Sequence, residues 1–163
     1  MFSYYASPFP HIVWDDLELE VEPVDVTLKE SDLFRFYQSM ELKDDPVIAQ
    51  VKQFLLGNKE LWKETFGVNI TSMDAFMSEY RDHCYLLPHD DRLDDRQLAW
   101  IYYLNAGTGG DLVLYNGDER PTTEAKRVTV QPGRLIVFPV GSWHMVAEVT
   151  GGVRRAVGGW LYE

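Results

Sequence analysis

The sequence predicts a mainly β fold of the α+β class, a jelly roll or barrel that carries helices on one outer face. Two observations lead to this prediction. From about Met73 onward, short apolar runs alternate with turn residues, whereas the first third of the chain has apolar residues at helical spacing. Closely spaced strands that follow a set of helices are typical of a curled sheet covered on one side.

Helices are expected in three segments of the first third. Asp45 and Pro46 form an N-cap and first-turn pair, and the apolar residues that follow are spaced for a helix over 45–57. A second helix is predicted over 58–67, where asparagine is placed to begin it and glycine to end it. The amphipathic segment 31–40 is predicted to be a further helix.

Strands are expected in the rest of the chain, separated by glycine, proline and asparagine turns. They are Ala75–Tyr80, Leu98–Leu104, Leu112–Tyr115, Arg127–Val130, Leu135–Phe138, Trp143–Val149 and Val153–Tyr162, with Val13–Trp14 and Leu19–Val26 as additions at the front. No linker divides the chain. We therefore expect one domain over 1–163, in which 1–72 is a helical support region with edge strands and 73–163 is the core.

Composition and charge narrow the range of partners. Lys and Arg number 15 against 26 Asp and Glu, so the formal charge is −11, which repels nucleic acid and anionic membranes. A single cysteine, Cys84, leaves no intrachain disulfide or multi-cysteine metal site. The sequence has no secretory signal at its start and no run of membrane-spanning length. We expect a cytoplasmic protein, a monomer or a weak homodimer.

A candidate metal site comes from three residues. His89 and Asp91 are two apart just before a predicted strand, and in an extended segment both side chains would point the same way. With His144 they would make a set of two histidines and one carboxylate, which suits non-haem Fe(II). The alternative is a solvated loop histidine beside an aspartate that caps a helix.

An arginine pair lies within the last predicted strand. By strand alternation, Arg154 shares a face with Ala156 and Gly158, and Arg155 points to the other side. A buried arginine needs an anion, and the small neighbours of Arg154 leave room for one. A carboxylate bound by two parallel hydrogen bonds would satisfy it. The alternative is an internal salt bridge to one of the many acidic residues.

Residues 79–163 resemble the catalytic core of Fe(II)/2-oxoglutarate-dependent oxygenases of the prolyl 4-hydroxylase-like branch, in particular the hypoxia-sensing and ribosomal prolyl hydroxylases. The order of the shared pieces agrees throughout. They are His89-X-Asp91, Ile101-Tyr102-Tyr103-Leu104-Asn105, Gly109-Gly110-Asp111-Leu112, Pro132-Gly133-Arg134-Leu135-Ile136-Val137-Phe138, His144-Met145-Val146, and Arg154 followed six residues on by Trp160.

The resemblance implies a distorted double-stranded β-helix, which is a cupin-like jelly roll, with the N-terminal helices packed on one sheet. It implies Fe(II) as the metal, 2-oxoglutarate and O2 as co-substrates, and ascorbate as an aid in vitro. The metal ligands would be His89, Asp91 and His144. Arg154 would bind the distal carboxylate of 2-oxoglutarate, helped by Tyr103, and Tyr80, offset by one residue from the family tyrosine, would line the same pocket.

The activity that the resemblance implies is hydroxylation of a C–H bond with release of succinate and CO2. We expect a prolyl residue of a peptide or protein as the substrate. The alternatives are a free amino acid or other small molecule, a non-catalytic jelly-roll binding module, and a cupin enzyme that needs no keto acid. Nucleic acid is not expected, because demethylases with the same triad carry a second arginine where this chain has Trp160.

Overall fold

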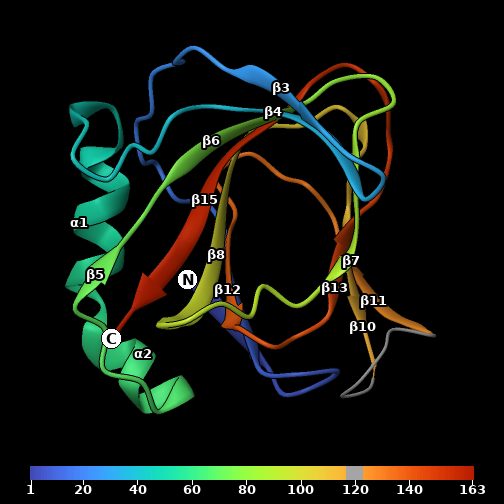
Figure 1. Ribbon diagram of the computed structural model, residues 1–163. Coiled ribbons are helices and arrows are strands. Elements are labelled where there is room, and N and C mark those ends of the chain that lie inside the picture. The colour runs from blue at the N-terminus through green and yellow to red at the C-terminus, as the bar shows by residue number, and fades with distance from the viewer. Residues whose placement is uncertain (117–122) are drawn as a thin grey trace.

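The computed structural model describes residues 1–116 and 123–163. Strands dominate it, so the predicted mainly β fold with a few helices is confirmed (Figure 1). The strands are β1 (Phe2–Tyr5), β2 (His11–Trp14), β3 (Thr27–Glu30), β4 (Phe34–Gln38), β5 (Ser72–Met73), β6 (Phe76–Tyr80), β7 (Tyr85–His89), β8 (Arg96–Asn105), β9 (Thr108–Gly109), β10 (Leu112–Tyr115), β11 (Glu124–Val128), β12 (Leu135–Pro139), β13 (His144–Val146), β14 (Val149–Gly151) and β15 (Arg154–Tyr162).

Most of these strands form one curled antiparallel sheet. Its order across the described residues is β1-β2-β12-β8-β15-β6-β4-β7-β13-β10-β11, with β3 paired to β4 and β5 to β15. Strand β4 pairs with both β6 and β7, so it joins the wall that contains β8 and β15 to the wall that contains β7 and β13. Figure 1 shows these two walls facing each other.

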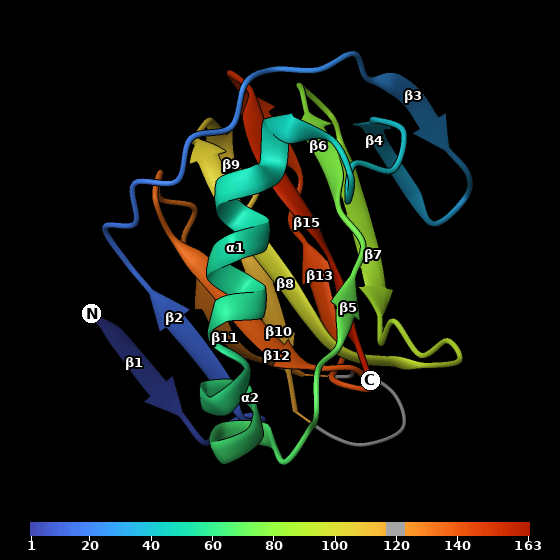
Figure 2. The same ribbon diagram turned by 90° about the vertical axis from the view of Figure 1, so that its left-hand side faces the viewer.

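Two α-helices cover the outer face of the first wall. Helix α1 (Ala49–Gly57), preceded by the 3₁₀ turn Pro46–Ile48, and helix α2 (Lys59–Phe66) agree with the two helices predicted over 45–67. Their buried residues share one core cluster with Trp100 of β8 and Val157 of β15. Figure 2 shows α1 lying across these strands. None of the helices in the described ranges is long and apolar enough to cross a lipid bilayer.

The caps of these helices follow the sequence signals with one difference. The Asp45 side chain accepts a hydrogen bond from the Val47 amide at 2.9 Å, as expected of an N-cap. Gly67 ends α2 with a φ of 73°, in the left-handed region that favours glycine. Asn58 precedes α2, but its side chain donates to the Phe54 carbonyl oxygen and does not cap that helix.

The prediction of a helix over 31–40 is wrong. This segment contains β4, which pairs with β3, β6 and β7. The apolar spacing of the segment fits a helix or a strand. Its backbone groups can pair with those of β3, β6 and β7 only when the segment is a strand. The strand expected at Leu19–Val26 is also absent. The Leu19 amide instead donates to the Tyr102 hydroxyl, and the apolar side chains of the segment pack on the core.

The later strands agree more closely with the prediction. Leu112–Tyr115 matches β10, and the expected strand over 143–149 is divided between β13 and β14. Strand β7 was not predicted, because the proline at 88 and the turn residues around it obscure the alternation. It is the neighbour of β13, so the missed strand is one that positions the candidate site.

The core beneath the helices depends on Trp62. Its side chain is fully buried, and its indole nitrogen donates to the Leu55 carbonyl oxygen at 2.7 Å. We expect Trp62→Ala to lower the free energy of unfolding by about 3–5 kcal/mol in urea denaturation, because it leaves a cavity. The control Met40→Ala, at a site that is 85% exposed, should change it by less than about 0.5 kcal/mol. Equal effects of the two substitutions would contradict this placement of Trp62.

Candidate metal centre

Strand pairing brings the two histidines together. His89 ends β7 and His144 begins β13, and the register of these strands places the two residues opposite each other. Their ring centroids are 4.1 Å apart. Asp91 follows β7 with a φ of 63°, so it does not continue an extended strand as the spacing argument assumed. The left-handed backbone at Asp91, which aspartate tolerates better than most residues, brings the carboxylate between the rings instead.

The side-chain atoms of this cluster are arranged as a ligand set. His89 Nε2 lies 3.2 Å from one Asp91 carboxylate oxygen, and His144 Nε2 lies 3.1 Å from the other. One ligand atom from each residue lies within 4.8 Å of the others. The Nδ1 atoms donate to the carbonyl oxygens of Leu87 and Ser142, each at 2.8 Å. These hydrogen bonds fix both ring orientations, so that both Nε2 atoms face the Asp91 carboxylate.

The electrostatics of the cluster favour an ionised carboxylate. Burial alone would raise the pKa of the Asp91 carboxyl, but hydrogen bonds with His144 and His89 hold that pKa well below its usual range. Burial likewise opposes the charged form of His89, and the neighbouring Asp91 nevertheless raises the pKa of this imidazole. A cation at this position would therefore meet a carboxylate that is already deprotonated.

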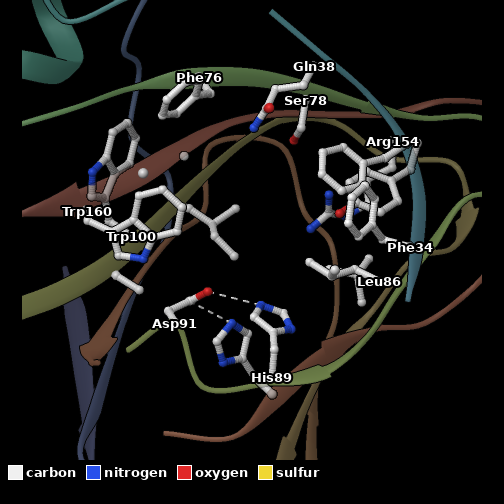
Figure 3. A pocket seen from close by; sticks show the side chains of 18 of the residues that line it. Phe34, Gln38, Phe76, Ser78, Leu86, His89, Asp91, Trp100, Arg154 and Trp160 are labelled. Carbon is white, nitrogen blue, oxygen red and sulfur yellow. Dashed lines mark ion pairs between the residues drawn. The ribbon is translucent and has the colours of Figure 1, made fainter. Parts of the chain in front are cut away.

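The cluster borders a cavity of about 260 Å³ inside the curled sheet. Figure 3 shows the cavity and the metal cluster, which consists of the side chains of His89, Asp91 and His144. Arg154 lies at one end, and Trp160 lies at the other. The remaining lining residues are mostly apolar.

Arg154 is a buried cation without a carboxylate partner among the described residues. Its side chain is only 2% exposed, its Nη2 donates to the Tyr103 hydroxyl at 3.4 Å, and its Nε has no hydrogen-bond partner. The guanidinium lies 4.6 Å from the ring centroid of Tyr80 and 4.9 Å from that of Tyr103. Because a buried guanidinium without an anion is costly, this end of the cavity fits an anionic group.

Arg155 has a different environment. Its Nη2 and Nε lie 2.6 and 2.9 Å from the Glu79 carboxylate, which also pairs with Arg81 at 2.7 Å. Arg154 lines the cavity and Arg155 does not. Alternation along β15 accounts for the difference, since Gly158 and Trp160 line the cavity on the same side as Arg154. The second arginine thus forms the internal salt bridge that was the alternative for the pair.

A glycine gives Arg154 its space. Gly110 has a φ of 80°, and a Cβ atom added there would lie 2.8 Å from Cδ of Arg154.

The other histidines lie outside the cluster. His11 is buried, with Nδ1 bonded to the Phe9 carbonyl oxygen, while the side chain of His83 is 76% exposed.

Comparison with known proteins identifies the family. The model of the 2OG-Fe(II) oxygenase superfamily matches residues 75–162, which is more than half of the chain. The chain belongs to this superfamily. It is 30% identical to prolyl 3-hydroxylase OGFOD1 of Mus musculus over 162 residues, and 30% identical to prolyl 3-hydroxylase sudestada1 of Drosophila melanogaster over 162 residues. These matches cover 91% and 87% of this chain, but the chain spans only 30% of the length of each relative.

Solved structures agree on the fold. A Pseudomonas putida prolyl-4-hydroxylase superposes with a TM-score of 0.68 at 20% identity, covering 85% of this chain and 78% of that one. The viral collagen prolyl hydroxylase of Paramecium bursaria Chlorella virus-1, solved with 2-oxoglutarate, gives a TM-score of 0.58 at 17% identity and covers 79% of each chain. The curled sheet is therefore the jelly roll that the sequence predicted.

Membership of the superfamily means Fe(II) as the metal and 2-oxoglutarate and O2 as co-substrates. The cavity fits these groups. Two imidazole nitrogens and one carboxylate oxygen are the donor set that non-haem Fe(II) takes, and they converge in this structure. The unpaired guanidinium of Arg154 is suited to a carboxylate of the keto acid.

Several lining residues had no signal in the sequence. Phe34, Phe36 and Gln38 reach the cavity from β4, which was expected to be a helix. Ser78 reaches it from a predicted strand, but its face could not be assigned without the sheet order. The sequence signal that could have found these residues is a pair of adjacent strands whose inward-facing side chains are mostly apolar.

The salt bridge behind the cavity predicts a pH effect. Burial would raise the pKa of the Glu79 carboxyl, but hydrogen bonds from Arg155 and Arg81 lower it below its usual value. A lowered carboxyl pKa adds stability above the pKa of the unfolded chain, about 4.3, and this stability is lost as the pH falls through the folded value. Glu79→Gln should therefore lower the free energy of unfolding by about 1–3 kcal/mol at pH 7.

The measurement is urea denaturation of both proteins between pH 7 and pH 3. The difference should shrink steadily below about pH 4, because the wild-type carboxylate is then protonated as well. Glu22→Gln, at an exposed position, serves as the matched control and should show no such difference. A difference that stays constant with pH would contradict the role of the Glu79 charge.

Proposed function

We propose that this chain hydroxylates a prolyl residue of a peptide or protein, consuming 2-oxoglutarate and O2 and releasing succinate and CO2. One observation carries the proposal: the His-Asp-His cluster and the unpaired Arg154 line the same cavity. The names of the two curated relatives support a prolyl substrate. Because the chain spans 30% of each relative, their activity passes to it only as part of this proposal.

The roles follow from the geometry. His89, Asp91 and His144 would hold Fe(II), and the hydrogen bonds from both Nδ1 atoms would keep the rings in place. Arg154, with Tyr103, would bind the distal carboxylate of 2-oxoglutarate, and the ring of Tyr80 would line the pocket that holds this carboxylate. Bound Fe(II) supplies the oxygen chemistry that couples decarboxylation of the keto acid to hydroxylation of a C–H bond. The apolar lining excludes water from the reacting groups.

We also propose that residues 1–163 act as one oxygenase domain. The core cluster supports this, because it contains Ile12, Ile48 and Trp62 from the first 72 residues together with Trp100 and Val157 from the rest. The first segment also supplies β4, which joins the two walls of the sheet. The support region would thus shape the cavity as well as cover the sheet.

The first test is turnover of the wild-type chain with Fe(II), ascorbate and air. We expect succinate to form from 2-oxoglutarate, and a prolyl peptide to gain the mass of one oxygen atom. His144→Ala should abolish iron binding and succinate formation together, because it removes one of three ligands. His83→Ala, at an exposed histidine, is the control and should keep both. Turnover that persists in His144→Ala would refute the ligand assignment.

The paired arginines offer a second test. Arg154→Lys should raise the KM for 2-oxoglutarate by about tenfold or more, because a point charge replaces a two-pronged donor. Arg155→Lys is the matched control, and since Arg155 pairs with Glu79 away from the cavity it should leave this KM within about twofold. Kinetics of succinate formation at saturating peptide would measure both. Equal KM values for the two variants would show that Arg154 is not the residue that binds 2-oxoglutarate.

A further inference from the structure

Two polar residues in the cavity have no place in the roles described so far. Gln38 of β4 and Ser78 of β6 are direct cross-strand neighbours, and both line the cavity. Neither side chain forms a hydrogen bond with another described residue. Figure 3 shows both side chains pointing into the cavity from the side opposite Asp91 and His89. The pair therefore faces the metal cluster across the space in which a substrate would lie.

An unpaired donor also occurs at the end of the cavity remote from Arg154. The indole nitrogen of Trp160, which lines this end, is buried and has no hydrogen-bond partner. An indole N–H only donates, so this group would be satisfied by an acceptor that a ligand brings. The ring of Trp160, with Phe76 nearby, forms an apolar surface against which a hydrocarbon ring can pack.

The polar groups of this region therefore match a ligand rich in acceptors and poor in donors. The Trp160 indole can only donate, whereas Gln38 and Ser78 can donate or accept. Asp91, which belongs to the metal cluster, is the sole acidic residue among the described residues that line the cavity. A ligand ammonium group would find no free carboxylate here. A prolyl residue inside a polypeptide fits, because its nitrogen has no N–H and the carbonyl groups on both sides only accept.

We propose that Gln38 and Ser78 determine substrate specificity by donating hydrogen bonds to the main-chain carbonyl oxygens that flank the target prolyl ring. The ring packs against Trp160 and Phe76, and the indole nitrogen of Trp160 supplies a further donor. This inference rests on the proposed prolyl hydroxylation. It adds that the site selects a prolyl residue with an acylated nitrogen and rejects free L-proline, whose charged ring nitrogen would face a donor-lined surface.

The test compares substrate and co-substrate kinetics of the full chain. Wild type is first assayed on a degenerate library of acetylated, amidated prolyl pentapeptides, and the best member becomes the probe. Gln38→Leu and Ser78→Ala should each raise the KM for this peptide roughly three- to tenfold, and the double variant should raise it further. The KM for 2-oxoglutarate should stay within about twofold, because Arg154 binds it at the other end of the cavity.

Matched controls separate these effects from changes in folding or surface polarity. Gln53→Leu and Ser72→Ala make the same chemical changes at exposed positions in α1 and β5, and they should leave both KM values unchanged. Gln38→Glu keeps the shape of the side chain but replaces a donor with an acceptor. It should weaken peptide binding at least as much as Gln38→Leu, with an unchanged midpoint of thermal unfolding.

The outcomes distinguish this inference from the proposed function. If wild type hydroxylates the peptide and the four variants of Gln38 and Ser78 match it, the role of the pair is refuted while prolyl hydroxylation stands. A rise in the KM for 2-oxoglutarate alone would place the pair at the co-substrate end and refute it too. Turnover of free L-proline at the efficiency of the peptide would refute the selectivity. Iron-dependent succinate formation without hydroxylation of any prolyl peptide would overturn the proposed function and this inference with it.

Discussion

The candidate site depends on how the sheet is closed by β4. This strand pairs with β6 through Tyr37 and Gln38, and with β7 through Phe34 and Arg35. Arg154 belongs to the wall on one side of this junction, and the two histidines belong to the wall on the other. Because backbone hydrogen bonds tie both walls to one strand, the cation and the metal cluster must face each other across the cavity. The same strand carries Gln38 into the space between them.

Burial gives two neighbouring arginines different chemistry. On the outward face of β15, Arg155 is neutralised by Glu79, and the partnership adds stability to the wall. On the inward face, Arg154 is left with a tyrosine hydroxyl and two aromatic rings. A buried cation without a counter-ion costs free energy, so this arrangement would favour the binding of a carboxylate.

The metal cluster shows the same preorganisation. Main-chain carbonyl oxygens hold Nδ1 of His89 and His144, and the left-handed backbone at Asp91 brings the carboxylate to both rings. The ligand atoms therefore converge through contacts made by the chain itself. A binding module without iron chemistry would have no use for this combination of three ligands and a separate anion site, which favours the oxygenase among the functions that the sequence left open.

The sequence by itself determined most of the later strands and the two helices on the outer face, and it selected His89, Asp91, His144 and Arg154 as candidate site residues, because these depend on local spacing and on an ordered set of motifs. Only the tertiary structure decided that 31–40 contains a strand, that Arg154 faces inward while Arg155 pairs with Glu79, and that Gln38 and Ser78 line the cavity. The physical reason is that apolar spacing in a short segment fits a helix or a strand equally well. The choice is made by backbone pairing with strands far away in the sequence, and that pairing also sets which side chains meet across the cavity.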